Sequence, residues 1–426
     1  MRMKLLVALL ASVTASSGVF AANLTDVYQL ARVNDAQFSA AQATYQANLE
    51  KLPQGRALMR PSIGFAANLR ENDSDNASAF SSHQYGVTLT QPLYRKQNLE
   101  IIEQAKLQVL LAEQALKGAE QSLKLRVAQA YFAVLQAQDV LATAQAQKQA
   151  LAEQLAQARK SFEVGVVTIT DAHEAQARFD LTSAQEIAAQ NDLEVKRRGL
   201  EKIINADSPT LARLHEGVKL ALPEPNNMDA WVKQAEADNV LVSMGQTAQE
   251  AARREVNKQR AGHQPTLDLG ANFSGSRNTA AAGNRTAGYL GLEFAVPLYQ
   301  GGATESRIRE AVAMQEKARF DLEDARRQAR LDARQGFLGV LSGEAQARAL
   351  EQAQVSSEAQ LRSTTLGLEV GVRTRVDVLN AQQQLYTTRR DLSAARYQTL
   401  LAGLQLKAAA GALNEDDLKA VDALLK

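Results

Sequence analysis

The chain has 426 residues, a formal net charge of +1 and no cysteine. The near-neutral charge argues against a nucleic-acid partner, and the lack of cysteine excludes disulfides, thiolate metal sites, cysteine nucleophiles and a lipid anchor on a cysteine. The four histidines lie far apart without metal-ligand spacing, and no hydrolase, phosphate-binding or zinc-protease motif occurs. We therefore expect no enzyme, no cofactor and no metal site.

The first 21 residues have the pattern of a secretory signal peptide. Arg2 and Lys4 precede an apolar stretch, residues 5–15, that is too short to span a bilayer as a helix. The residues at 19–21 then suit a signal peptidase, which predicts cleavage before Ala22. A retained membrane anchor is the alternative, but nothing after residue 15 extends the apolar run. We predict an exported protein.

Proline positions indicate where the helices lie. No proline occurs between Pro92 and Pro209, and none follows Pro297. Because proline is excluded from helix interiors, and because both stretches are rich in Ala, Gln, Leu, Glu and Arg, they predict very long helices. Apolar residues recur every seven positions in the first stretch, as in a coiled coil, at Ile102, Val109, Leu116 and Leu123. We expect helices over residues 24–58, 96–162, 169–203, 229–261, 302–367 and 374–411.

The lengths of these helices constrain how they pack. At 1.5 Å per residue, the helix at 96–162 would be about 100 Å long. The two shorter helices of each half, placed end to end, would match the one long helix of that half. These matched lengths suggest that paired helices surround a long axis.

Four segments alternate apolar residues with polar or small ones. They are residues 63–69, 85–89, 267–273 and 290–296. Polar stretches at 70–84 and 274–287 lie between the members of each pair, and we expect the second to form a loop. Alternation over roughly ten residues is typical of a membrane-spanning β-strand with one lipid-facing side. A soluble, half-buried hairpin is the alternative for either pair alone, but the signal peptide and the long helices favour the membrane.

Four strands are too few to span a membrane alone. An open sheet edge in lipid would leave its backbone groups without hydrogen bonds, and single-chain outer-membrane barrels begin at about eight strands. The chain must therefore oligomerise. Two copies would supply about 8 strands and three copies about 12, and the strand count does not choose between them.

The two halves of the chain are copies of each other. Residues 162–168 match residues 368–374 at an offset of 206, and Pro92-Leu93-Tyr94 matches Pro297-Leu298-Tyr299 at an offset of 205. Pro61 matches Pro265 at an offset of 204. A long repeat with a nearly constant offset indicates internal duplication. We predict a signal peptide at 1–21, a first repeat with its linker at 22–227, and a second repeat with a C-terminal equatorial segment at 228–426.

Residues 370–380, Val-Gly-Val-Arg-Thr-Arg-Val-Asp-Val-Leu-Asn, resemble the TolC family of outer-membrane efflux and secretion ducts. Residues 411–418 do too, and residues 164–171 are similar to the family's other hairpin tip. The resemblance implies a mainly α fold with a membrane β part. Long coiled-coil helices would form a periplasmic α-barrel, and four strands per protomer would contribute to the 12-stranded transmembrane β-barrel of a homotrimer in the outer membrane.

The resemblance also implies partners and an activity. The partners are outer-membrane lipid, a periplasmic adaptor and an inner-membrane pump driven by ATP (an ABC pump) or by protons. The activity is export of proteins, small toxic compounds or both. The alternative is a periplasmic coiled-coil adaptor of such a pump, although an adaptor would carry one helical hairpin rather than two copies with strands between them.

The family's entrance residues transfer to four positions. Thr170 and Asp171 match residues that help to close the periplasmic entrance, Arg373 matches the arginine that bonds across to them, and Asp377 matches an acidic residue around the constriction. This chain departs from the family's archetype at two positions: the archetype has a tyrosine at the position of Leu368 and an acidic residue at that of Asn380. Both departures should weaken the latch or the cation-selective field of this entrance.

The hairpin tips have a docking interpretation and a purely structural one. We predict that the Val-Gly pairs of the two tips form the surface that docks the adaptor; they are Val164, Gly165, Val370 and Gly371. Alternatively, both glycines are C-caps of the long helices. Thr168-x-x-Asp171 and Thr374-x-x-Asp377 likewise fit capping boxes, which sequence alone favours for both aspartates. A capping carboxylate can still face a lumen.

Overall fold

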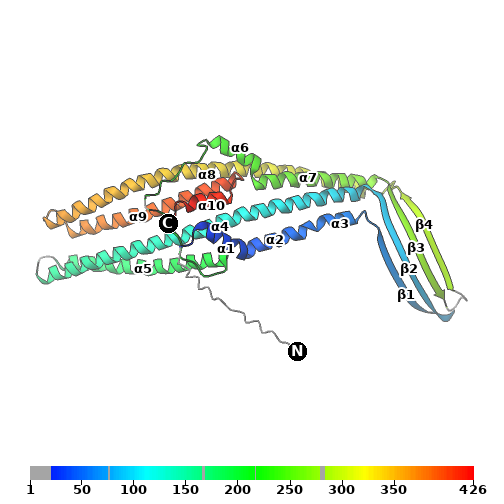
Figure 1. The fold of residues 1–426 in the computed structure, drawn as a ribbon, viewed down its shortest axis with the longest axis horizontal. Coiled ribbons are helices and arrows are strands. Elements are labelled where there is room, and N and C mark those ends of the chain that lie inside the picture. Colours follow the sequence, from blue (N-terminus) through cyan, green and yellow to red (C-terminus); the bar gives the residue numbers. More distant parts are fainter. Residues whose placement is uncertain (1–20, 75–76, 166–167, 216, 279–283) are drawn as a thin grey trace, which may run out of the picture.

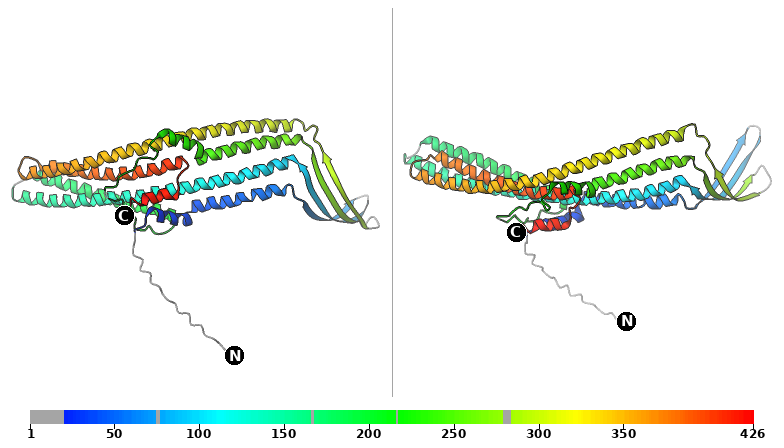
Figure 2. Two further views of the ribbon diagram at one scale, coloured as in Figure 1. Left: turned by 45° about the horizontal axis from the view of Figure 1, so that its top comes forward. Right: turned by 90° about the horizontal axis from the view of Figure 1, so that it is seen from above.

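A computed structural model describes residues 21–74, 77–165, 168–215, 217–278 and 284–426. The predicted signal peptide lies almost entirely outside these residues. The molecule is elongated, with long helices side by side along its axis and a β-sheet at one end (Figures 1 and 2). In the described part of the chain, no helix combines the length and the apolar character needed to cross a membrane.

Two very long helices run through the molecule. Helix α4 spans Lys96–Glu163 with 68 residues, and α8 spans Ala303–Glu369 with 67. Each is followed by a shorter antiparallel partner, α5 (Ile169–Ile204) or α9 (Arg375–Ala409). These bounds confirm the predicted long helices, because a proline-free stretch rich in helix-forming residues runs through each of them.

Two of the predicted helices are divided into shorter ones, and one further short helix is present. The region expected as one helix at 24–58 forms α1 (Leu24–Asn34), α2 (Ala36–Leu49) and α3 (Lys51–Ala57). The region at 229–261 forms α6 (Met228–Asp238), α7 (Val240–Arg260) and the 3₁₀ turn η1 (Ala261–His263). A last helix, α10, spans Glu415–Asp422.

Two short polar residues cause the main breaks. Asp35 has an extended backbone and accepts a hydrogen bond from the Phe38 N–H at 2.7 Å, which caps α2. Asn239 does the same for α7 by accepting from the Leu241 N–H at 2.8 Å. The prediction of unbroken helices was wrong here because these side chains bond to the backbone in place of the helical ladder.

The strands form one antiparallel sheet in the order β1-β2-β3-β4. They are β1 (Ser62–Ser74), β2 (Ala77–Arg95), β3 (Thr266–Asn278) and β4 (Asn284–Ala295). The predicted loop at 274–287 is largely strand, since Arg277 pairs with Asn284, and the polar stretch at 70–84 is also mostly strand. Backbone pairing does not require apolar side chains, so the ladder continues beyond the exposed apolar side chains of the outer strands. We call these side chains the apolar belt; they include Ile63, Phe65, Leu69, Leu290, Leu292 and Phe294.

The largest buried cluster lies near the middle of the helices, where the first and last described segments of the chain meet. The Tyr131 hydroxyl donates to the carbonyl oxygens of Ala22 and Ala212, at 3.1 and 2.8 Å. The Leu24 N–H donates to the Asp422 carboxylate of α10 at 2.8 Å. This equatorial core therefore fastens the start, the linker and the end of the described chain to α4.

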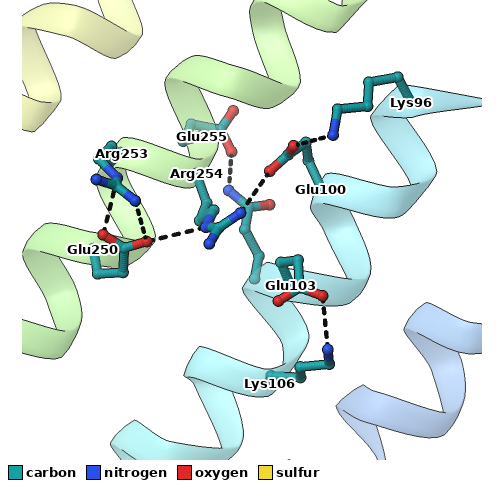
Figure 3. A network of polar contacts seen from close by, with 9 residues as sticks. Lys96, Glu100, Glu103, Lys106, Glu250, Arg253, Arg254 and Glu255 are labelled. Atoms are coloured by element: carbon teal, nitrogen blue, oxygen red, sulfur yellow. Dashed lines mark hydrogen bonds and ion pairs between the residues drawn. The ribbon is translucent and has the colours of Figure 1, made fainter.

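A polar network joins α4 to α7 close to the sheet (Figure 3). Arg254 lies between Glu250, at 3.0 Å, and the buried Glu100, at 3.5 Å. Nearby, the Gln104 side chain donates to Glu255 at 2.7 Å. Helices from the two halves of the chain are thus fixed to each other where the strands begin.

Candidate functional site

The two helical hairpins, α4–α5 and α8–α9, end together at the extremity opposite the sheet (Figures 1 and 2). The Gln154 amide of α4 donates to the Gln382 side chain of α9 at 2.7 Å, which ties the hairpins together above their tips. The predicted entrance and docking residues all lie at this end. Val166 and Val167, within the first tip motif, are outside the described residues.

Both tips begin with the same turn. Gly165 has φ of +78° and Gly371 has φ of +79°, a left-handed backbone that side-chain-bearing residues rarely adopt. Their N–H groups donate to the carbonyl oxygens of Phe162 and Leu368, at 2.9 and 3.1 Å. The structural alternative therefore holds in outline: each glycine ends its long helix, directly after the C-cap residue Val164 or Val370. The neighbouring Val164 and Val370 project into solvent as exposed apolar side chains.

Both following helices begin with a capping box, as predicted. The Thr168 N–H and hydroxyl donate to the Asp171 carboxylate, at 3.1 and 2.9 Å, and the Asp171 N–H returns a bond to Thr168 Oγ1 at 3.3 Å. Thr374 and Asp377 form the same three bonds at 2.9, 2.9 and 3.2 Å. Each box satisfies backbone groups that a helix start leaves open.

The Asp377 carboxylate is held in its charged form. The hydrogen bond from the Thr374 N–H, then that from the Thr374 hydroxyl, and then the positive charge of Arg373 lower the pKa of Asp377 below its usual value. The capping box therefore fixes a negative charge at the second tip at neutral pH.

Arg373 and Thr170 are both exposed at the tips. Arg373 lies over Gly367 in the last turn of α8, where any Cβ would come within 2.7 Å of Arg373 Cγ. Among the described residues of this one protomer, no hydrogen bond or ion pair joins the Arg373 side chain to Thr170 or Asp171. The link from Arg373 to the first tip stays a prediction.

A different arginine joins the hairpins. Arg178 of α5 donates to Asn380 Oδ1 at 2.9 Å and to Gln383 Oε1 at 3.3 Å, both on α9. It also forms an ion pair with Glu174 of its own helix at 2.9 Å. Asn380, one of the two departures, therefore accepts a bond between the hairpins. Sequence reasoning missed Arg178, whose only local signal is the i, i+4 spacing from Glu174.

Comparison with known proteins decides the family. The chain matches the family described as "Outer membrane efflux protein" over residues 27–206 and 231–412. The chain belongs to this outer membrane efflux protein family. The two matched segments fall one in each predicted repeat, and the division into two repeats stays a prediction.

Full-length relatives support the same assignment. The chain is 35% identical to the outer membrane protein TolC of Vibrio cholerae, over 97% of this chain and 96% of that one. It is 34% identical to the alkaline protease secretion protein AprF of Pseudomonas aeruginosa, over 95% and 87%. The predicted outer-membrane location and export function are confirmed, and the alternative of a periplasmic adaptor is not supported.

Solved structures of two outer-membrane proteins share the fold. The outer membrane protein VceC of Vibrio cholerae superposes with a TM-score of 0.78 at 18% identity, covering 91% of this chain and 96% of that one. The CmeC outer membrane channel of Campylobacter jejuni gives a TM-score of 0.81 at 15% identity, covering 94% and 89%. The predicted combination of long helices and a four-stranded contribution to a membrane β-structure is confirmed.

Proposed function

We propose that three copies of this efflux protein form one duct through the outer membrane. The observation that carries the proposal is the open four-stranded sheet, whose outer strands β1 and β4 each have one edge without a partner among the described residues of the protomer. Their apolar side chains are exposed, among them Phe65 and Leu292. Lipid would leave such edges unsatisfied, whereas three copies supply about 12 strands for a closed barrel.

The native mass of the detergent-extracted protein tests this proposal. We expect the mass of a trimer, and a monomer or a dimer would overturn it. The measurement uses the full exported chain without labels. A detergent-stable trimer would also account for the exposed apolar belt as the lipid-facing surface.

The duct would receive its cargo from an inner-membrane pump through a periplasmic adaptor. We propose that the adaptor docks at the tips, on Val164, Gly165, Val370 and Gly371, since both tips present the same exposed turn at the end far from the sheet. The pump is of the ABC or the proton-driven type. The proposed cargo is protein, small toxic compounds or both, and the channel itself needs no cofactor and performs no catalysis.

The entrance would be closed by charge and hydrogen bonding around the axis. Three Asp377 carboxylates would repel one another in a narrow lumen, and Arg373, four residues earlier, would offset them while linking to Thr170 or Asp171. Exposed ion pairs contribute only about 0–1 kcal/mol each, so one link cannot lock the tube. Threefold repetition supplies the rest, and opening would be an iris-like movement of α8 and α9.

A further inference from the structure

The two hairpins of the sheet have the same strand register once the repeat offsets are applied. In the first hairpin Ile63 lies opposite Leu89, and in the second Leu267 lies opposite Phe294. The offset between Pro61 and Pro265 is 204 residues, and that between Pro92 and Pro297 is 205. Adding 204 to the residue numbers of β1 and 205 to those of β2 converts the first pair into the second. The internal repeat thus reproduces an observed register.

The same operation gives the register of a pairing that one protomer cannot make. Within the protomer β2 pairs with β3, and Thr90 lies opposite Gly270. The repeat converts β2 into β4 and β3 into β1, so this pair becomes Ala295 opposite Ala66. Strands β4 and β1 are at opposite edges of the sheet, and the pairing therefore joins two copies of the chain.

The apolar pattern agrees independently with this register. It sets Phe294 opposite Ala67 and Leu292 opposite Leu69, so that the exposed apolar side chains of both strands share one face. A slip of one residue would move every apolar side chain of one strand to the other face. Slips of two residues keep the faces, and the repeat excludes them.

The exposure of equivalent side chains differs between the paired end of β2 and the end of β4. After an irregularity at Pro92, β2 continues to Arg95 and stays paired with β3, and Leu93 and Tyr94 are 46% and 42% exposed. Their counterparts after β4 are Leu298 and Tyr299, which are 92% and 85% exposed. Strand β4 stops at Ala295, and no strand among the described residues of the protomer pairs with the segment that follows it.

We propose that β4 of one protomer pairs antiparallel with β1 of the next in this single register, with Ala295 opposite Ala66. Residues 296–300 then join β4 as strand, and Tyr299 comes to lie opposite Ile63 of the neighbouring copy. The proposal rests on the trimer proposed above and adds to it which residues meet at the seam between copies.

Paired cysteines test the register, because the chain has none of its own. The predicted pair is Ala66→Cys with Ala295→Cys, and both side chains face away from the apolar belt. The matched controls combine Ala295→Cys with Gly64→Cys or with Asn68→Cys, one slip of two residues in each direction. Directly opposite Cβ atoms lie about 4.5–5.5 Å apart and diagonal ones roughly 7–8 Å, so only opposite residues suit a disulfide. Thr90→Cys with Gly270→Cys is the equivalent pair within a protomer and serves as the reference.

After mild oxidation of the trimer, the predicted pair should give covalent species larger than a protomer on a denaturing gel, in several-fold higher yield than either control. A higher yield from a control pair, or a covalent dimer from Ala295→Cys alone, would overturn the register. The register would also be wrong if the reference pair formed its disulfide while Ala66→Cys with Ala295→Cys gave no link between copies. If native mass shows a trimer in these cases, only the register fails; if it shows no trimer, the proposed function fails too.

Discussion

The ion pair between Asp35 and Arg126 gives a stability prediction that separates charge burial from simple contact loss. Both guanidinium Nη atoms contact the Asp35 carboxylate, at 2.9 and 3.0 Å, and the Phe38 N–H donates to it as the cap of α2. Asp35 is 4% exposed. In the variant Arg126→Met the apolar stem is largely retained and the carboxylate is left buried without its cation.

The cost follows from these contacts. Removing one partner of a buried pair costs about 3–5 kcal/mol. The lower end applies here, because the Phe38 N–H still solvates the carboxylate and because Arg126 Nε, itself buried without a partner, is removed as well. At about 2.1 cal/mol/K per residue, a protomer of roughly 400 residues has an unfolding entropy near 0.85 kcal/mol/K, so about 3 kcal/mol lowers the midpoint by roughly 3–4 °C.

The pH dependence has a definite sign. Burial raises the pKa of Asp35, but the hydrogen bonds from Arg126 and from the Phe38 N–H outweigh it and hold the pKa below its usual 3.8. The parent therefore has the full contribution of this carboxylate above pH 3.8 and loses it as pH falls through the lower folded value. Without Arg126 burial dominates and the folded pKa rises. The deficit of the variant should be full at neutral pH and shrink toward about pH 4.

Thermal unfolding of the detergent-solubilised protein, followed by circular dichroism at one scan rate and concentration, measures these shifts. Arg198→Met is the matched control, because its ion pairs are exposed to solvent and therefore contribute little to stability. Asp35→Asn keeps a capping side chain, and adding it to Arg126→Met should recover part of the loss. If Arg126→Met lowers the midpoint no more than Arg198→Met does, or if the added Asp35→Asn lowers it further, a buried carboxylate without its cation is not the cause of the lost stability.

Three further predictions concern the tips. Gly371→Leu, and likewise Gly165→Leu, puts a branched side chain on a left-handed backbone at the proposed docking surface, so export should stop while trimer yield stays normal; surviving export would leave the glycines as helix caps only. In planar bilayers Arg373→Ser should conduct more than the parent, and Asp377→Ala should lose cation preference and block by multivalent cations; unchanged behaviour of both would leave Asp377 its capping role alone. Arg178→Met removes the bonds from α5 to α9, so single-channel conductance should rise, and an unaltered conductance would show that these bonds do not restrain the hairpins.

The sequence predicted the features that depend on local pattern. The proline-free stretches rich in helix-forming residues placed α4 and α8 almost to the residue, and the Thr-x-x-Asp spacing predicted both capping boxes. The helix breaks at Asp35 and Asn239 were not predicted, because a polar residue inside a helical pattern looks the same whether it faces solvent or caps a new helix. Arg178 and Asn380 are 202 residues apart, and only the packing of the two hairpins brings them together.

The hydrogen bonds between the first and the last described helix have a consequence for how the chain itself folds after it is secreted. The N–H groups of Leu24 and Thr25 donate to the carboxylate of Asp422, which lies 398 and 397 residues further along the chain. While the chain is still emerging into the periplasm, these groups cannot bond to the Asp422 carboxylate until the last described helix has crossed the inner membrane. A contact between residues this far apart in sequence closes a very long loop and carries the corresponding entropic cost. A chain that stops before residue 422 lacks this carboxylate, so the equatorial core that joins its first and last helices would be left incomplete.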